Sequence, residues 1–208
     1  MLLIERNSDV GGTWFCNRYP GCMSDVEALA YLPLLERFTD EYMPSRKYVP
    51  QKEILEHARR IAKKFGLLQH IWFESFMHGA CWMDLDSTWN IQVSHKGKDT
   101  VVVAQHLILA AGRLTTPNIP RMVGIDSFAG NILHTSEWPA NTGVDVMHGK
   151  RIAVIGTGAS AIQVIPEIAR VAERLFVFQR HAPFVTPRLN SSLEDVKRRI
   201  ETGLLSNT

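Results

Sequence analysis

The order of hydrophobic and polar positions changes several times along the chain, and two of the patterns indicate buried strands. Residues 2–4, LLI, form a short apolar run that ends at Glu5. Residues 106–112, HLILAAG, form a second such run, which ends on Gly112. Strands that are buried on both faces carry continuous apolar runs of this kind. Both segments are therefore predicted to be parallel strands of an α/β sheet.

Between these two runs, the pattern predicts a helix followed by antiparallel strands. Over residues 51–65, apolar side chains recur at helical spacing with charges on the other face, and Gly66 follows. This is typical of an amphipathic helix that ends at a glycine. Residues 71–104 consist of short β-rich runs divided by turn residues such as Gly79. They predict an antiparallel β-meander.

The clearest pattern begins at residue 151. Residues 151–155 form an apolar strand, and residues 156–161 form a glycine turn. A helix follows over about residues 160–172, and residues 175–179 form a second strand. Together these elements predict one complete βαβ unit of Rossmann type.

The connection before this unit contains several prolines and is too irregular for a helix. We therefore predict a first domain over residues 1–113, a linker over residues 114–149 and a second domain over residues 150–208. A last helix is predicted within residues 191–205, after a candidate N-cap serine.

Composition excludes several classes of protein. The 208-residue chain has a net charge of +2 with dispersed basic residues, so neither nucleic acid nor a membrane is an expected partner. No apolar run approaches the roughly 18 residues of a transmembrane helix. Three cysteines without a CxxC pair favour free thiols in a reducing compartment, so a cytoplasmic protein is predicted. The histidines and cysteines lack the spacing of a zinc site, and no metal is expected.

The glycine turn carries the strongest chemical signal. Gly156 allows the tight turn, Gly158 lets backbone N–H groups approach a pyrophosphate, and Ala161 lets helix and strand pack closely. The residues of the turn that are predicted to bind a cofactor are Gly156, Thr157, Gly158, Ala159, Ser160 and Ala161.

Two further residues refine this prediction. Arg180 follows the second strand, where an NAD-binding protein would carry an acid, and its planar cation suits the 2′-phosphate of NADP(H). Glu5 ends the first strand, where an acid suits a ribose without a 2′-phosphate, as in FAD. A solvated arginine and a surface glutamate are the alternative interpretations. Gly112 is a further candidate cofactor contact at a predicted strand end.

Three longer stretches resemble Baeyer–Villiger monooxygenases. Residues 10–27, VGGTWFCNRYPGCMSDVE, resemble the loop beside the flavin in these enzymes. Residues 128–139, FAGNILHTSEWP, match their fingerprint Phe-x-Gly-x-x-x-His-x-x-x-Trp-Pro at every fixed position. Residues 175–188, LFVFQRHAPFVTPR, resemble the stretch after the NADP-binding strand in these enzymes. The resemblance covers nearly all of residues 1–190. The residues in these stretches are most similar to those of fungal members that oxidise polyketide-derived metabolites.

The resemblance implies a two-domain flavoprotein, in which residues 1–113 are part of an FAD-binding domain with the meander inserted. Residues 114–149 are then the linker with the fingerprint, and residues 150–208 part of the NADP-binding domain. It implies that NADPH reduces FAD and that one oxygen atom of O₂ is inserted into a ketone, giving an ester or lactone.

By motif, the resemblance also assigns residues to the flavin side. Asp25 matches an aspartate that steers an active-site arginine, and it is the candidate catalytic residue, although a plain loop aspartate is the alternative. His134 is expected to act structurally. The residues expected beside the isoalloxazine ring are Gly11, Gly12, Thr13 and Trp14.

The sequence departs from the resemblance at its ends. No glycine loop for FAD precedes residue 2, and the region of the catalytic arginine would follow residue 208, so a chain truncated at both ends is expected, with a second chain as a candidate partner that completes the FAD domain. Two alternatives stay open: an inactive remnant or NADP-binding module, and a flavin monooxygenase that oxidises nitrogen or sulfur. Trp138 argues against the latter.

Overall fold

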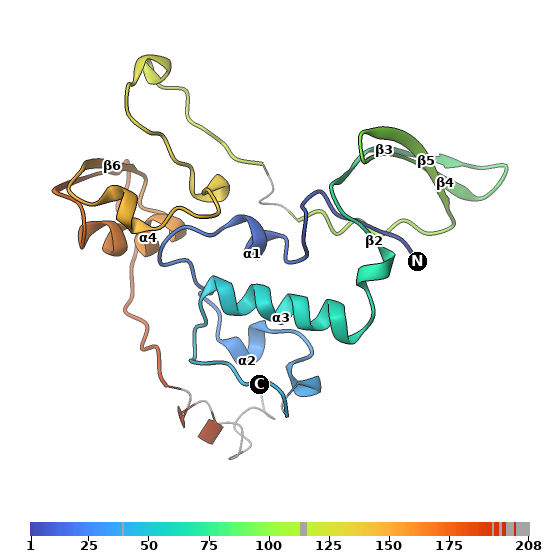
Figure 1. The fold of residues 1–208 in the computed structure, drawn as a ribbon, viewed down its shortest axis with the longest axis horizontal. Helices are drawn as coiled ribbons and strands as arrows, with labels where there is room; N and C mark the ends of the chain where they lie inside the picture. The colour runs from blue at the N-terminus through green and yellow to red at the C-terminus, as the bar shows by residue number, and fades with distance from the viewer. Residues whose placement is uncertain (39, 113–115, 193, 196, 199–201, 203–208) are drawn as a thin grey trace. The chain divides into compact units, whose positions relative to one another are not determined.

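The computed structural model describes residues 1–38, 40–112, 116–192, 194–195, 197–198 and 202 (Figure 1). By their contacts the residues form two units, of which the first joins residues 1–15 to 55–116 and the second joins residues 16–54 to 117–208. The boundary predicted between residues 113 and 114 lies outside the described residues, and the three predicted domains stay a prediction.

The first unit contains a short parallel pair and an antiparallel meander. β1 (Leu3–Ile4) pairs in parallel with β2 (Ile71–Trp72). β3 (Ser75–Met83), β4 (Thr88–His95) and β5 (Lys98–Ala104) form a three-stranded antiparallel sheet in that order. The parallel strand predicted at the start of the chain and the predicted meander are therefore both present.

Two details of the meander differ from the sequence prediction. Residues 71–72 belong to the parallel pair, because Glu74, at φ 51°, turns the chain before β3 begins. Gly79 does not divide two strands: β3 runs through it, and the register with β4 shifts between Met77 and Gly79. A β-bulge of this kind bends a strand without ending its ladder.

The parallel strand predicted at residues 106–112 is absent. The segment is irregular, with Ile108 87% and Leu109 70% exposed, and none of the described strands pairs with it. A strand forms only where a neighbour completes its backbone hydrogen bonds. An apolar run therefore did not decide the conformation of this segment, and the prediction was wrong.

The amphipathic helix is present as α3 (Gln51–Lys64), and Gly66 ends it by a specific mechanism. Gly66 has φ 61°, its N–H donates to the carbonyl of Lys63 at 3.1 Å, and the N–H of Leu67 donates to the carbonyl of Ala62 at 2.8 Å. These two bonds form a Schellman motif, which requires a left-handed residue where glycine is favoured. The prediction of a glycine-terminated helix is confirmed.

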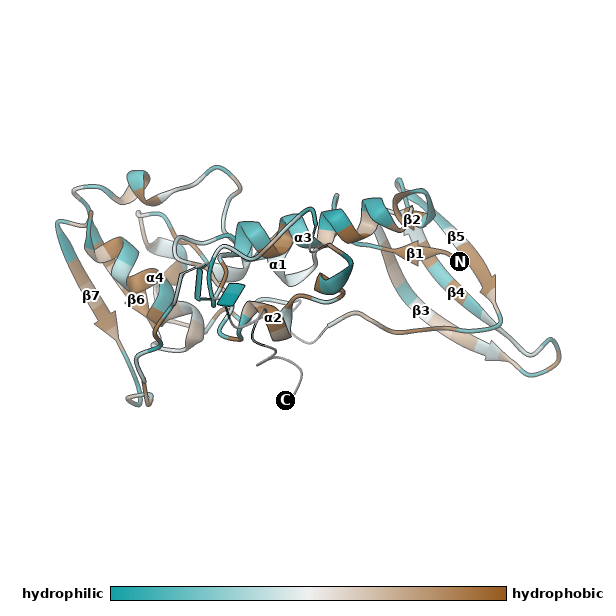
Figure 2. Ribbon diagram, turned by 90° about the horizontal axis from the view of Figure 1, so that it is seen from below, coloured by the Kyte–Doolittle hydropathy of each residue, from teal (hydrophilic) through white to brown (hydrophobic). Residues whose placement is uncertain are grey.

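The second unit contains the predicted βαβ unit. β6 (Arg151–Ile155) and β7 (Arg174–Phe178) are parallel neighbours joined by α4 (Ala159–Ala169). Val164 and Ile168 lie one turn apart on α4 and are each 3% exposed, and β7 is largely hydrophobic in Figure 2. A helix with one apolar face and strands with apolar runs follow the predicted pattern.

The remaining helical elements are short. They are α1 (Thr13–Cys16), α2 (Ala28–Tyr31) and the 3-10 helices η1 (Leu35–Arg37), η2 (Leu68–His70), η3 (Ile125–Ser127), η4 (Thr135–Glu137) and η5 (Val144–Met147). The described residues between 116 and 150 contain no α-helix, as predicted. Much of the last helix predicted within residues 191–205 lies outside the described residues.

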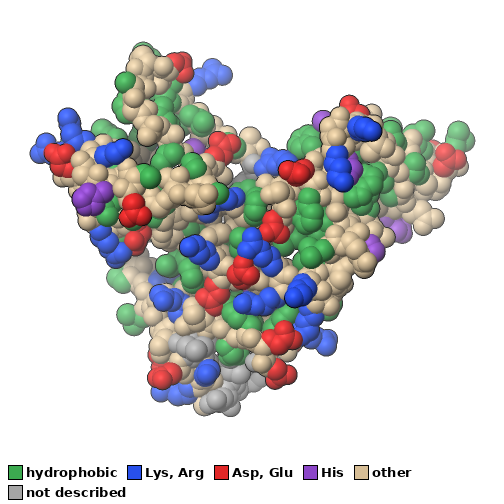
Figure 3. All heavy atoms as spheres, in the orientation of Figure 1, with side chains coloured by type: hydrophobic (Ala, Val, Ile, Leu, Met, Phe, Trp, Pro, Cys, Tyr) green, Lys and Arg blue, Asp and Glu red, His purple; other side chains and the backbone are tan. Residues whose placement is uncertain are grey.

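The distribution of surface charge and the length of the helices bear on the partners that were excluded from the sequence. On the face shown in Figure 3, basic and acidic side chains are interspersed. No helix among the described residues has the length and apolar character needed to cross a lipid bilayer.

Candidate functional site

The turn between β6 and α4 leaves open space in front of the helix. Gly156 has φ 102°, a backbone conformation that glycine readily adopts, and its N–H donates to the carbonyl of Phe178 at 2.8 Å. Gly158 is the N-cap of α4, and an added Cβ at either glycine would meet no atom within 4 Å. The space that these glycines keep free is the space that an anion at a helix N-terminus occupies.

A solvent-open pocket of about 380 Å³ lies at this turn. Arg180 is exposed, and among the described residues it forms no ion pair. A guanidinium beside a helix N-terminus is suited to a phosphate that a neutral turn alone would not select. The pocket brings together residues from both sides of the βαβ unit: Gly156, Thr157, Gly158, Arg180, His181, Ala182 and Pro183.

Sequence reasoning identified only part of this pocket. His181 and the two residues after it line the pocket but were not predicted. Their position directly after Arg180 in the sequence could have indicated that they belong to the site. Ala159, Ser160 and Ala161, which were predicted, form the first turn of α4 and do not line the pocket.

The N-terminal half of α4 also holds a segment that is distant in the sequence. The Gln163 Oε1 accepts a hydrogen bond from the Tyr19 hydroxyl at 2.9 Å, and Gln163 Nε2 donates to the Met23 carbonyl at 3.0 Å. Tyr19 is 7% exposed, and burial raises the pKa of its hydroxyl, with a smaller lowering effect from a hydrogen bond to Ser160. Sequence patterns did not reveal these contacts, because the partners are more than 100 residues apart.

Asp25 follows directly on this segment. Its side chain is exposed, whereas the neighbouring Ser24 is 2% exposed and its hydroxyl donates to the Val26 carbonyl at 2.8 Å. Cys22 is also buried, and burial raises the pKa of its thiol to about 11. A thiol of this kind stays protonated at neutral pH, where the thiolate is the nucleophile.

In the first unit, the two predicted flavin-side glycines have different surroundings. Gly11 has φ 113°, and an added Cβ would lie 2.5 Å from Cδ1 of Leu55. Gly12 has φ 50°, and its added Cβ would meet nothing within 4 Å. The N–H of Trp14 donates to the Gly11 carbonyl at 3.0 Å, which starts α1. The first glycine therefore permits close packing, and the second leaves open space.

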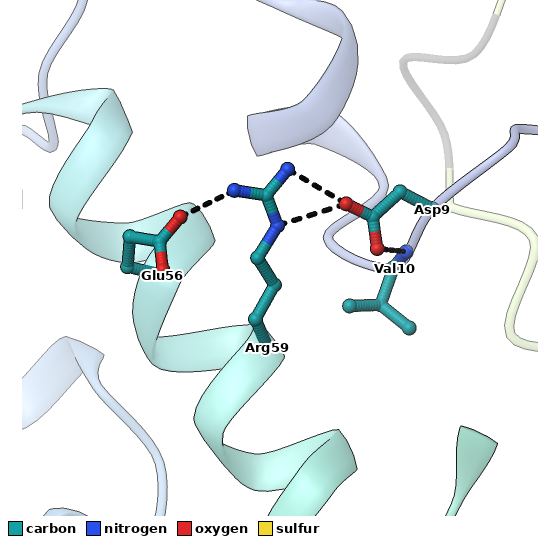
Figure 4. Close-up of polar contacts among 4 residues, drawn as sticks. All are labelled: Asp9, Val10, Glu56 and Arg59. Carbon is teal, nitrogen blue, oxygen red and sulfur yellow. Dashed lines mark hydrogen bonds and ion pairs between the residues drawn. The ribbon is translucent and has the colours of Figure 1, made fainter.

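An ion-pair cluster holds the start of this turn (Figure 4). Arg59 Nε and Nη2 both donate to Oδ2 of Asp9, at 2.8 and 2.7 Å, and the N–H of Val10 donates to the other carboxylate oxygen of Asp9 at 2.7 Å. Glu56 binds Nη1 on the far side of the same guanidinium. The residues are 50 positions apart, and no sequence pattern indicated that they meet.

Replacing Arg59 with lysine is expected to loosen the turn at residues 10–15. Lysine keeps the charge but cannot present two fixed donors to one carboxylate. Since the Arg59 and Asp9 side chains are 42% and 27% exposed, solvent weakens the pair, and we expect a loss of only about 0.5–1 kcal/mol. Amide hydrogen exchange over residues 10–15 should become roughly two- to fivefold faster. Glu56→Gln, which leaves the Asp9 bonds intact, is the control. Equal exchange rates in both variants would mean that the paired hydrogen bonds from Arg59 to Asp9 do not hold the turn.

Glu5 lies at the end of β1 and is half-buried. Its Oε1 accepts hydrogen bonds from the backbone N–H and the side-chain amide of Asn7, at 2.7 and 2.8 Å. Among the described residues, Oε2 has no hydrogen bond, so one carboxylate oxygen is available to a ribose hydroxyl. Gly112 is exposed with φ 70°, and the strand that was predicted to position it is absent.

The fingerprint residues make structural contacts in the second unit. Trp138 is 5% exposed, and its indole N–H donates to the Thr142 carbonyl at 2.7 Å. His134 Nδ1 accepts a hydrogen bond from the N–H of Ser136 at 3.3 Å, and the His134 side chain thereby caps η4. These contacts organise the linker locally, and neither His134 nor Trp138 lines the glycine-turn pocket.

A second cavity, of about 390 Å³, lies on the meander, away from every predicted site residue. His78 Nε2 is 2.6 Å from the Ser94 hydroxyl, which donates to Asp99. This network is exposed and lies between neighbouring strands, so we regard it as a cross-strand contact. Among the described residues, no group of three histidine, cysteine or acidic side chains could hold a metal ion.

The open glycine turn of a βαβ unit and an acid at the end of a parallel strand define an α/β protein of the dinucleotide-binding class. A family model described as flavin-binding monooxygenase-like matches residues 3–195. The chain belongs to this flavin-binding monooxygenase-like family.

Relatives and solved structures agree with this assignment. The chain is 40% identical over 191 residues to the FAD-binding monooxygenase ausB of Aspergillus calidoustus, covering 86% of this chain and 30% of that protein. It is 41% identical over 195 residues to the Baeyer-Villiger monooxygenase ATR8 of Stachybotrys chlorohalonatus, covering 90% and 30%. The crystal structure of OTEMO in complex with FAD and NADP superposes with a TM-score of 0.87 and 38% identity, covering 98% of this chain and 39% of that one.

The chain thus spans about 30% of the length of the curated relatives it matches. These matches confirm the predicted resemblance to Baeyer–Villiger monooxygenases and the α/β fold class with two dinucleotide-binding domains.

Proposed function

We propose that the protein is an FAD- and NADPH-dependent monooxygenase that inserts one oxygen atom of O₂ into a ketone, giving an ester or lactone. The observation that carries this proposal is the pocket where the glycine turn and Arg180 meet, in a chain whose relatives are named as FAD-binding and Baeyer-Villiger monooxygenases. The fungal relatives favour a substrate from secondary metabolism. The three free cysteines favour a cytoplasmic location.

On the NADPH side, the residues present fit the nucleotide. A Cβ at Gly156 or Gly158 would project into open space, so the backbone can approach a pyrophosphate. Thr157 lines the same pocket, and the helix N-terminus contributes a favourable dipole. Ser160 and its alanine neighbours support the turn from the first turn of α4. Arg180 would bind the 2′-phosphate through its planar donors.

On the FAD side, the fit rests on open space at Gly12 and on Oε2 of Glu5, which accepts no hydrogen bond from the described residues. Glu5 would accept a ribose hydroxyl through Oε2, while Asn7 holds the other oxygen. Gly12 would allow the ring to approach the backbone, with Thr13 and Trp14 following at the start of α1. Gly112 would approach the same cofactor by its backbone. Asp25 would orient a cationic side chain near the flavin.

When bound, FAD supplies the activation of O₂ and NADPH supplies the hydride. The residues of this chain bind and orient these groups. The relatives' names favour ketone oxidation over oxidation of nitrogen or sulfur, and the buried Trp138 belongs to the fingerprint of the ketone-oxidising class.

The proposal is tested by titrating the purified protein with FAD and NADPH. Bound flavin should give an absorbance band at about 450 nm that NADPH bleaches without oxygen. Readmitted oxygen and a cyclic ketone should then give a lactone in equal amounts to the NADPH consumed. A colourless protein that binds NADP⁺ would support the NADP-binding module instead. Turnover of a sulfide but not of the ketone would support the nitrogen- and sulfur-oxidising class.

A further inference from the structure

One side chain of α4 connects the nucleotide turn to the segment that carries Asp25. Gln163 lies on the turn of α4 that follows Gly158, whose carbonyl accepts the N–H of Ile162 at 3.0 Å. Its Oε1 accepts a hydrogen bond from the Tyr19 hydroxyl at 2.9 Å and a longer one from the N–H of Met23 at 3.4 Å. Its Nε2 donates to the Met23 carbonyl at 3.0 Å. The amide therefore uses both its donor and its acceptor on one distant segment.

The contact is tight in the backbone as well as in the side chains. An added Cβ at Gly21 would lie 2.5 Å from the carbonyl oxygen of Gln163. Because Tyr19 and Cys22 are each 7% exposed, these bonds are largely shielded from water. Residues 19–23 therefore pack directly against α4.

We propose that Gln163 is a positioning residue, which transmits occupancy of the glycine-turn pocket through α4 to residues 19–25 and so sets the position of Asp25. The inference rests on the proposed function, because the occupant is NADP(H). A nucleotide at residues 156–158 restrains the N-terminus of α4, and Gln163, one turn on, carries that restraint to the Met23 backbone. Asp25 lies two residues beyond the second contact point.

Hydrogen exchange with and without NADP⁺ tests this on the intact chain. In the wild type, NADP⁺ should slow amide exchange both at residues 156–160 and at residues 21–25. Gln163→Leu should speed exchange at residues 21–25 by about tenfold without nucleotide, since two or more shielded hydrogen bonds are lost. NADP⁺ should then protect only residues 156–160, and its Kd should change by less than about threefold.

Two further variants separate positioning from folding. Gln163→Glu keeps the acceptor for Tyr19 and loses the donor to Met23, so it should restore part of the NADP⁺-dependent protection at residues 21–25. Arg170→Gln removes the ion pair with Glu167 at the C-terminal end of α4 and none of the Gln163 hydrogen bonds, and should behave as the wild type.

The outcomes distinguish this inference from the proposed function. Binding of NADP⁺ with protection at residues 156–160 but none at residues 21–25 would overturn the inference alone. Protection at residues 21–25 that persists in Gln163→Leu would do the same. A wild type that binds no NADP⁺ would overturn the NADPH part of the proposed function and the inference with it.

Discussion

Replacing Gly21 with alanine is expected to destabilise the second unit by about 2–5 kcal/mol, from two sources. Gly21 has φ 78°, and an L-residue in this left-handed region costs about 1–2 kcal/mol. The new Cβ would also lie 2.5 Å from the carbonyl oxygen and 3.2 Å from the carbonyl carbon of Gln163. These are backbone atoms of α4, which cannot rotate away as a side-chain end can, so the helix and the loop must separate.

Gly149→Ala is the matched control for this prediction. Gly149 lies in the same unit with φ 67°, but an added Cβ would meet nothing within 4 Å. It should therefore lose only the backbone cost of about 1–2 kcal/mol. Urea unfolding monitored by tryptophan fluorescence compares the two, since Trp138 is buried in this unit. Equal losses in both variants would mean that the loop does not pack tightly on α4.

Replacing Arg180 with alanine is expected to weaken NADP⁺ binding by about 10- to 100-fold, because hydrogen bonds to a charged group contribute about 1.5–3 kcal/mol. NAD⁺ lacks the 2′-phosphate, so its affinity should change by less than about twofold. Arg180→Lys should give an intermediate loss, because an ammonium supplies the charge without the planar pair of donors. Isothermal titration with both nucleotides at one fixed salt concentration measures the ratio.

Arg170→Ala controls for the loss of a positive charge. The Arg170 side chain is 70% exposed and pairs with Glu167 at the end of α4. Arg170 does not line the pocket at the glycine turn. It should leave the ratio of the two affinities unchanged. If Arg180→Ala lowers the affinities for NADP⁺ and NAD⁺ equally, Arg180 contributes general attraction and does not recognise the 2′-phosphate.

The elements that sequence reasoning predicted correctly are those whose signal is local. α3 follows from helical spacing over fourteen residues and from Gly66, whose left-handed conformation completes two specific hydrogen bonds. The βαβ unit follows from two apolar runs around a glycine turn. The prediction at residues 106–112 failed because a strand depends on a neighbour, and an apolar run cannot report whether that neighbour is present.

The sequence by itself determined the class of this protein, because the glycine turn, Arg180 and the residue 128–139 fingerprint are each contiguous and chemically specific. Only the tertiary structure decided what surrounds these residues. It brought Arg180 to the turn, Arg59 to Asp9, and Gln163 to Tyr19, the last across 144 positions. Such contacts leave no periodicity along the chain, because they arise when separate elements pack and a buried polar group needs a partner.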